Sequence, residues 1–448
     1  MMKRLVLLLN LLALPAAAQQ VSIPHTTFTL ANGLRVIVAE DHSAPVAAVN
    51  VWYHVGSGYE RPGRTGFAHL FEHIMFEGSK NVPEGDFDNW LEAAGARNNG
   101  STTTDRTNYY EVMPSNAVEL ALWLEADRMG GLLDAMSPSK LEGQRGVVQN
   151  ERRQNYENQP YGLLWETAPP LLYPQGHPYS WTTIGSMADL DAAQLDDVSQ
   201  FFRTYYAPNN ASIAIVGDVN PQQVRQWVER YFAWIPRGQE VQRPQATPVS
   251  LSGTTYTVRE DRVSLPDVSM IWHTGRRFSQ DEAALNALAA ILTDGKSSRL
   301  YKRLVYDEQV AAFTQAFNDA SLLNGEMWIR IRAKPDVDLD RIEAAVDEEV
   351  ARLAQTPPSR EELDRVVNGL VTGFVGALET VEGKADRLND YLYYAGDPGF
   401  AERDLARYRA LTPGDVQRVA QQYLAGRNHV VISIVPQGKT ELGAQENQ

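Results

Sequence analysis

The chain has 448 residues, of which 43% are hydrophobic and 22% are charged, and its formal net charge is −15. This composition supports well-packed cores in two to four units of roughly 150 residues each. The acidic balance excludes nucleic acid as an expected partner, because few cations are available to neutralise phosphates. The absence of cysteine excludes disulfides and thiolate metal ligands.

The first 18 residues have the pattern of a secretory signal peptide. Lys3 and Arg4 precede an apolar run from residue 5 to residue 14, and three alanines, residues 16–18, form a cleavage site. No later segment reaches the ~18 apolar residues that a membrane span needs. We therefore expect export without membrane insertion, and the lack of disulfides favours the bacterial periplasm.

Two stretches of the first half have similar counterparts in the second half. DVSQFFRTYYAPNN begins at Asp197 and DVQRVAQQYLAGRN begins at Asp415, and they share Asp, Val, Tyr, Ala and Asn at one constant spacing. VWYHVG, residues 51–56, parallels MIWHTG, residues 270–275, at nearly the same spacing. A duplicated unit is the simplest explanation.

Each unit reads as strand, turn, helix, strands, helices and strand. This order predicts an α+β fold with two duplicated domains of mostly antiparallel sheet flanked by helices. The predicted domains are residues 19–235 and 254–440. They are joined by a linker rich in Pro, Gln, Ser and Gly at 236–253, and a polar tail follows at 441–448.

The motif HLFEH occupies residues 69–73 within an otherwise apolar stretch. On a helix, His69 and His73 lie one above the other, so both imidazoles can reach one Zn²⁺, and Glu72 lies beside them. The inverted order of this motif is typical of inverzincins. The alternative is an ordinary buried helix in which the three polar groups satisfy one another by hydrogen bonding.

A third ligand is expected from a second helix, beginning near residue 139. The segment Ser139–Glu142 resembles a capping box that opens this helix. Leu141, Val147 and Val148 mark its apolar face, and Glu151 falls on the same face. A carboxylate there needs a strong partner such as a divalent cation.

The second unit provides an internal comparison for this motif. At the aligned positions it has Asn286, Ala289 and Ala290, and Leu370 stands opposite Glu151. The four polar groups are thus lost together while the scaffold is kept. This favours one shared metal site in the first unit only.

Three ligands without cysteine favour a catalytic zinc, one per chain, with an open fourth position. Zinc lowers the pKa of water from 15.7 to roughly 7, and Glu72 would take the proton of that water. The expected reaction is metal-assisted hydrolysis of an amide bond.

Together with HLFEH, the segments NNGSTTTDRTNYYE and NERRQNYENQPYG resemble those of the pitrilysin/insulinase family of zinc peptidases. Bacterial members of this length resemble the beta subunit of the mitochondrial processing peptidase. The resemblance implies two repeated domains that close like a clam on an inner chamber. It also implies a zinc endopeptidase that acts on peptides or unfolded polypeptides.

The resemblance assigns a role to each residue of the motif. His69 and His73 match the zinc histidines, Glu72 matches the general base, and Glu151 matches the third ligand. Asn150 is the other possible alignment, but a neutral amide is a poor zinc ligand.

Two further positions follow from the resemblance. Many members carry a glutamate seven residues before the third ligand, where this chain has Gln144. Asn99, Gly100 and Ser101 match an edge strand that pairs with the substrate backbone. From these residues alone, a polar turn next to an ordinary edge strand is the alternative.

The second half departs from the family at two positions that hold the substrate. Single-chain and homodimeric members have an Arg and a Tyr seven residues apart, whereas this chain has Val305 and Ala312. We therefore expect a zinc-bearing subunit with a homologous non-catalytic partner. The rival interpretation is a structural or assembly subunit of the core-protein type.

His54 and His273 occupy equivalent places in the two units. Because both persist where the zinc positions vanish, we predict a structural role for them.

Overall fold

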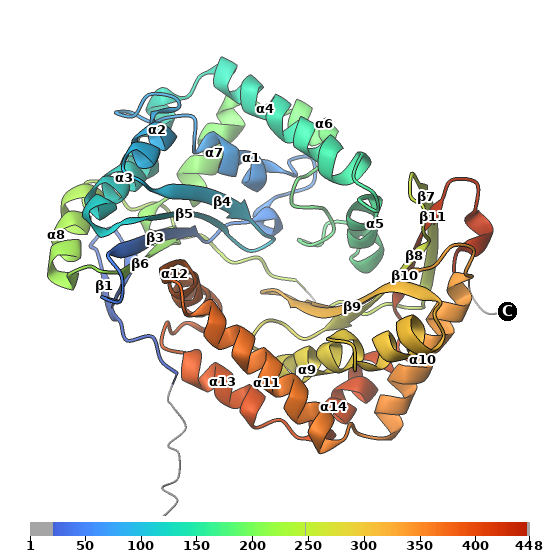
Figure 1. Ribbon diagram of the computed structural model, residues 1–448. Helices are drawn as coiled ribbons and strands as arrows, with labels where there is room; N and C mark the ends of the chain where they lie inside the picture. Colours follow the sequence, from blue (N-terminus) through green and yellow to red (C-terminus); the bar gives the residue numbers. More distant parts are fainter. Residues whose placement is uncertain (1–20, 247, 446–448) are drawn as a thin grey trace, which may run out of the picture.

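The computed structural model describes residues 21–246 and 248–445. The predicted signal peptide, residues 1–18, and the last residues of the predicted tail lie outside this range. The two halves of the chain face each other like the shells of a clam (Figure 1). Among the described residues, no helix combines the length and the apolar character needed to cross a membrane.

The first half is built on one sheet of mixed direction. Its strands, in spatial order, are β1 (Thr26–Thr29), β2 (Arg35–Glu40), β6 (Ala211–Gly217), β3 (Val46–Tyr53), β5 (Thr107–Pro114) and β4 (Arg97–Thr102). Only β2 and β6 run parallel, and every other neighbouring pair is antiparallel. The strand β4 lies at the edge, so one of its sides is unpaired.

The second half repeats this order. Its strands are β7 (Thr255–Asp261), β11 (Val430–Pro436), β8 (Asp267–Thr274), β10 (Gly325–Ala333) and β9 (Ala311–Ala320). Here too one pair, β7 and β11, is parallel, and the rest are antiparallel. The predicted α+β duplication is thus confirmed for five strands of each sheet, with β9 as the counterpart of β4, whereas β1 has no counterpart among the described residues of the second half.

Helices flank both sheets. Those of the first half are α1 (Phe67–Ile74), α2 (Asp86–Ala93), α3 (Val118–Ala135), α4 (Pro138–Arg152), α5 (Leu163–Leu172), α6 (Met187–Asp191), α7 (Leu195–Tyr205) and α8 (Pro221–Phe232). Those of the second half are α9 (Glu282–Thr293), α10 (Leu339–Gln355), α11 (Arg360–Ala377), α12 (Val381–Asp390), α13 (Ala401–Arg409) and α14 (Pro413–Val419). Between α8 and β7, the described residues of the predicted linker form neither helix nor strand.

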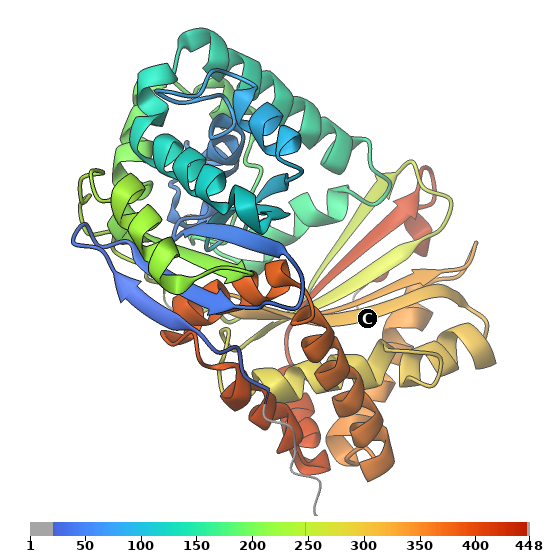
Figure 2. The same ribbon diagram turned by 60° about the vertical axis from the view of Figure 1, so that its left-hand side comes forward.

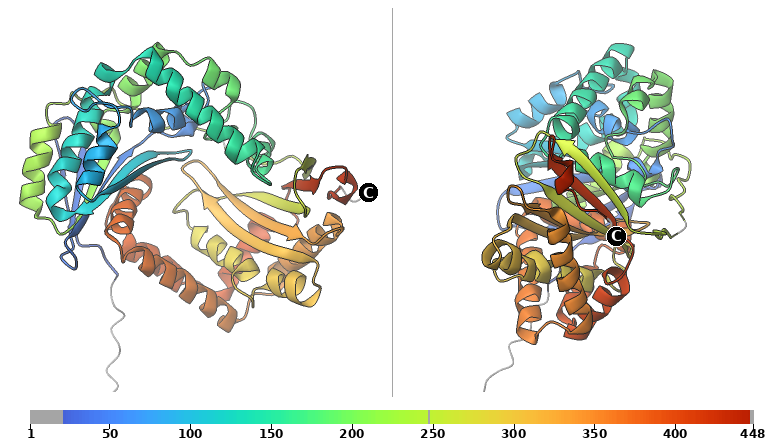
Figure 3. Two further views of the ribbon diagram at one scale, coloured as in Figure 1. Left: turned by 45° about the horizontal axis from the view of Figure 1, so that its top comes forward. Right: turned by 90° about the vertical axis from the view of Figure 1, so that its right-hand side faces the viewer.

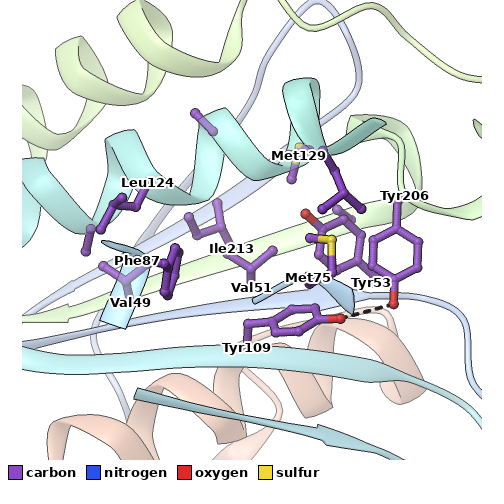
Figure 4. Packing of buried hydrophobic residues seen from close by; sticks show 14 of the residues in the cluster. Val49, Val51, Tyr53, Met75, Phe87, Tyr109, Leu124, Met129, Tyr206 and Ile213 are labelled. Atoms are coloured by element: carbon purple, nitrogen blue, oxygen red, sulfur yellow. Dashed lines mark hydrogen bonds between the residues drawn. The ribbon is translucent and has the colours of Figure 1, made fainter. Parts of the chain in front are cut away.

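Alternating residues of β3 build the core of the first half. Val49, Val51 and Tyr53 point to one face of the sheet and pack toward α3 (Figure 4). Tyr109 from β5 and Tyr206 join this core, and their hydroxyl groups are hydrogen-bonded at 3.2 Å. This core supports the back of α1 and so fixes the helix that carries HLFEH.

Each half lends a helix to the sheet of the other. The helix α12 of the second half packs Val381, Ala385 and Leu388 on the face of the first sheet that is turned away from α3 (Figures 1 and 2). Conversely, α5 of the first half packs Leu164 and Ala168 on the second sheet. The reciprocal exchange ties the two halves together through apolar burial.

A buried ion cluster, the Arg128 triad, lies beneath β5. Arg128 on α3 donates from Nε to Glu125 Oε2 at 2.9 Å and from Nη2 to Glu111 Oε1 at 3.3 Å. All three side chains are at most 1% exposed. Aromatic rings, including Phe87 and Tyr109, cover the guanidinium. One cation therefore offsets two carboxylates, and burial together with Glu125 raises the pKa of Glu111 well above its usual value.

Two details of α4 differ from the sequence prediction. The helix is capped by Ser137, whose hydroxyl accepts from the backbone N–H of Lys140, so the predicted capping box at Ser139 is wrong. Pro138 explains the shift, since proline favours the first helical position. Val147 is 47% exposed rather than part of the apolar face. Val148 alone carries that face near Glu151, at 0% exposure.

Candidate metal centre

The start of α1 is fixed by groups distant in sequence. Gly66 has a φ of +86°, a conformation that favours glycine, and a Cβ there would meet the carbonyl oxygen of Ile184 at 2.5 Å. The carboxylate of Glu60 accepts from the N–H groups of Gly66 and Ala68 at 3.0 and 2.7 Å. It thus satisfies donors that a helix start leaves unpaired. The orientation of α1 is therefore set before any ligand binds.

Three side chains from α1 and α4 converge on one point. His69 Nε2 and His73 Nε2 lie 3.6 and 3.2 Å from Glu151 Oε2. One ligand atom from each residue falls within 4.8 Å of the others. With bonds of about 2.0–2.2 Å, tetrahedral zinc ligands lie roughly 3.3–3.5 Å apart, so this donor set fits the ion. We call these three residues the His–His–Glu cluster.

The electrostatics of the cluster suit a cation. Burial and the neighbouring His73 lower the pKa of His69 to about 4, so its imidazole is neutral near pH 7, as ligation requires. The hydrogen bond from His73 lowers the pKa of Glu151, which keeps that carboxylate charged. His69 Nδ1 is buried, and no hydrogen-bond partner for it is found among the described residues. A cation bound here would meet the neutral imidazole of His69 and the charged carboxylate of Glu151.

Glu72 lies between α1 and the edge strand β4. Its Oε2 accepts a hydrogen bond from Thr102 Oγ1 at 2.6 Å. A Cβ at Gly100 would lie 3.0 Å from Glu72 Cγ, so the absence of a side chain there lets the strand approach the glutamate. Burial raises the pKa of Glu72. The carboxylate is thus oriented by the strand, and its raised pKa makes it a better proton acceptor than an exposed glutamate.

The second half has the same helix pair without the cluster. There α9 packs against α11 as α1 packs against α4. Asn286, at the position of the first histidine, donates to the hydroxyl of Tyr408 at 2.8 Å. Leu370, opposite Glu151, packs against the second core. Hydrophobic packing and one neutral hydrogen bond are therefore what this scaffold requires when no ligand set is present.

The side chain of Gln144 is hydrogen-bonded to a neighbouring carboxylate. Its Nε2 donates to Glu77 Oε1 at 2.5 Å, so the amide is paired with a carboxylate of the segment following α1. Burial, with a contribution from Glu84, raises the pKa of Glu77, and the hydrogen bond from Gln144 opposes that shift. A carboxylate is therefore present near the cluster even though the family glutamate is absent.

The structure places the predicted residues in two groups. His69, His73 and Glu151 meet in the cluster with Glu72 beside them, whereas Asn99–Ser101 lie on β4 at the sheet edge. The sequence analysis missed Thr102, which lies two residues beyond Gly100 and so on the same face of the strand. That periodicity is the signal that could have identified it.

The two equivalent histidines have partners within the fold. His54 stacks on Tyr393 with ring centroids 4.7 Å apart, and its Nε2 lies 3.1 Å from Ser212 Oγ. His273 Nε2 contacts the carbonyl oxygen of Leu172 at 2.9 Å. The contact of His54 with Tyr393 and that of His273 with Leu172 each join the two halves of the sequence, in keeping with a structural role.

A duplicated α+β fold in which one half alone carries an inverted His–His–Glu cluster is the architecture of the inverzincin class of zinc peptidases. Residues 35–167 match the family described as "Insulinase (Peptidase family M16)", and residues 192–370 match "Peptidase M16 inactive domain". The chain belongs to the insulinase family, peptidase family M16.

Named relatives span a range of roles. The chain is 30% identical over 425 residues to the zinc protease PqqE of Helicobacter pylori, covering 94% of each chain. It is 25% identical to a probable beta subunit of the mitochondrial-processing peptidase of Arabidopsis thaliana, covering 93% of this chain and 79% of that one. It is 28% identical to cytochrome b-c1 complex subunit 1 of Rattus norvegicus, covering 60% of this chain and 56% of that one.

Solved structures share the fold. The crystal structure of a protease from Helicobacter pylori matches with a TM-score of 0.87 at 28% identity. The match covers 93% of this chain and 100% of that one. The fold is therefore that of a peptidase family whose similar proteins include a named zinc protease and a subunit of the cytochrome b-c1 complex.

Proposed function

We propose that this chain is a zinc-dependent endopeptidase acting on peptides or unfolded polypeptides. The observation that carries the proposal is the His–His–Glu cluster, whose spacing fits tetrahedral zinc and whose counterparts in the second half are apolar or neutral. A subunit with a purely structural role has no use for three convergent ligands and a neighbouring, partly buried glutamate.

His69, His73 and Glu151 would hold the ion. When bound, Zn²⁺ supplies Lewis-acid activation of water and of the scissile carbonyl. Glu72 acts as general base and later passes the proton to the leaving amine. Because Thr102 donates to Oε2, we assign the proton transfer to Glu72 Oε1.

The edge strand supplies a route for the substrate backbone. On its outer side β4 has no neighbouring strand, so N–H and C=O groups of Asn99, Gly100 and Ser101 can pair with an extended peptide. Because Gly100 packs on Glu72, a peptide paired there would lie next to the general base. Main-chain pairing of this kind makes little demand on sequence and suits unfolded chains.

Zinc analysis tests the cluster directly. We expect one zinc per chain in the purified protein. Loss of a residue that only hydrogen-bonds to a zinc ligand typically weakens zinc binding by roughly 10–100-fold. His73→Ala removes a ligand itself and should weaken zinc binding by more than that. The matched control is His42→Ala, because His42 is an exposed histidine outside the cluster, and this variant should keep its zinc. Absence of stoichiometric zinc from the wild type would contradict the proposal and favour a core-protein-type subunit.

We further propose that the catalytic chain works with a homologous, non-catalytic partner. Val305 packs against the second core and Ala312 is exposed on β9, and neither side chain can donate a hydrogen bond to a substrate. Peptide digestion by the chain alone should therefore be weak, and it should rise when a partner bearing the missing Arg and Tyr is added. Robust peptidase activity of the chain alone would sink this proposal.

We also propose export to the bacterial periplasm. The support is the signal-peptide pattern of residues 1–18 and the absence of cysteine from the chain.

A further inference from the structure

A cavity of about 250 Å³ lies between the two halves, and its lining is aromatic and acidic. The first half contributes Thr104, Tyr156 and Trp165, and β9 and β10 of the second half contribute most of the opposite wall. Among the described residues that line it there is no lysine or arginine. We call it the acidic–aromatic cavity.

Two successive cross-strand pairs of β9 and β10 form most of the wall from the second half. Phe317 on β9 stands directly opposite Trp328 on β10, and Asp319 stands opposite Glu326. Residues two apart on a strand share a face, so the aromatic pair and the acidic pair lie side by side. All four residues line the cavity. Because of the pairing register of β9 and β10, a flat apolar surface therefore lies beside two carboxylates on this wall.

The aromatic part of the wall is extended by the first half. Trp328 stacks on Phe317 with centroids 5.9 Å apart and an interplanar angle of 8°. The ring centroid of Trp165, on α5, lies 5.3 Å from that of Trp328, and Trp165 is 41% exposed. Indole rings favour a nearby cation and also pack well on an aliphatic chain.

No ion pair with the acidic pair is found among the described residues, although the more distant charge of Arg277 acts on Asp319 against the effect of burial on its pKa. Glu326 accepts from two neutral donors, Tyr173 Oη and Trp328 Nε1, each at 2.7 Å, and burial raises its pKa to about 7. Asp319 is accessible, and no hydrogen bond or ion pair of its side chain is found within the described structure. Like charges directly opposite each other are destabilising, so this arrangement calls for a positively charged occupant.

The cavity adjoins the metal centre. Tyr156 follows Glu151 on the helical extension Arg153–Glu157, and the charge of Glu151 helps to raise the pKa of Tyr156 after burial, its main cause. Thr104 lies just beyond the edge strand β4. A peptide paired with β4 would therefore pass the mouth of the cavity.

The two walls are held in register by one buried carboxylate. Asp105 accepts from Tyr179 Oη of the first half at 2.6 Å and from the backbone N–H of Leu322, in the β9–β10 turn, at 2.8 Å. Thr104 and Ser321 are also in contact, with 3.4 Å between their hydroxyl oxygens. The cavity is thus formed before a substrate arrives.

We propose that the acidic–aromatic cavity binds one basic side chain, lysine or arginine, of the polypeptide substrate. The aliphatic stem packs on the aromatic wall, and the charged end meets Asp319 and Glu326. This inference rests on the proposed peptidase function and adds a substrate preference to it.

Peptide binding to a zinc-loaded Glu72→Gln background, in which cleavage is slowed, tests the cavity. The probes are N-acetylated, C-amidated peptides of small neutral residues in which one arginine is moved along the chain, each paired with a citrulline version. Acetylation removes the free amine as a competing cation. We expect one position at which arginine binds about tenfold more tightly than its neutral isostere citrulline.

Asp319→Asn should abolish most of that difference, because it removes one charge from an accessible site on an edge strand. The matched control is Asp336→Asn, a side chain of the second half that is 73% exposed and does not line the cavity. Equal binding of both peptides at every position, or a preference that survives in Asp319→Asn and Glu326→Gln, would overturn the cavity proposal alone. Failure of every peptide to bind when any required partner is also present would overturn the peptidase proposal as well.

Discussion

Glu72→Gln should lower kcat by about 10²–10⁴-fold, the usual contribution of a general base. The amide keeps the size of the side chain and can still accept the hydrogen bond from Thr102, but it cannot take a proton. The loss is therefore chemical rather than structural. The measurement is the turnover of a fluorogenic peptide in the presence of any required partner, together with zinc content.

Glu142→Gln is the matched control for this variant. Glu142 lies on α4, the helix that carries Glu151, but its side chain is 71% exposed and pairs only with Arg145 among the described residues. Its variant should keep both turnover and zinc. Unchanged turnover in Glu72→Gln with zinc still bound would overturn the assigned mechanism.

Arg128→Met should destabilise the protein by about 3–5 kcal/mol, because it leaves Glu111 and Glu125 buried without their cation. The urea midpoint of unfolding, followed by circular dichroism, measures the effect. The control Arg225→Met removes an exposed pair with Glu229 and should cost at most about 1 kcal/mol.

A triple variant separates lost charge from lost packing. If Arg128→Met is combined with Glu111→Leu and Glu125→Leu, no uncompensated charge remains, and apolar replacement of a buried ion cluster is often neutral or stabilising. Much of the lost stability should therefore return. If Arg128→Met lowers the urea midpoint of unfolding no more than the exposed control does, the triad contributes little to stability.

The proximity of the three candidate ligands could be predicted because its signals are local or repeated. The four-residue spacing of His69 and His73 is a property of one helix, and the duplicated unit showed which polar groups the scaffold does without. Glu151 lies beside both histidines even though Val147 is exposed, since Val148 alone carries the apolar face. The helix cap was misplaced by two residues because the effect of Pro138 was overlooked.

Other features depend on contacts that no local pattern encodes. The acidic pair of Asp319 and Glu326 exists only because β9 and β10 pair in one register. The Arg128 triad requires a strand and a helix to meet, although Glu125 and Arg128 are only three residues apart. The exchange of α5 and α12 was equally hidden, because an amphipathic helix does not reveal which of two similar sheets it covers.

That exchange bears on how a substrate enters. To swing the halves apart, the molecule would have to strip α12 from the first sheet and α5 from the second, exposing both apolar interfaces to water at once. The two exchanged helices therefore hold the halves together from both sides. The strands β4 and β9 each lie at the edge of their sheet, so both keep an unpaired side while the two halves stay together (Figure 3, left). Under the proposed peptidase function, an extended chain can pair with such an edge without any separation of the halves, whereas a folded domain offers no free backbone for it.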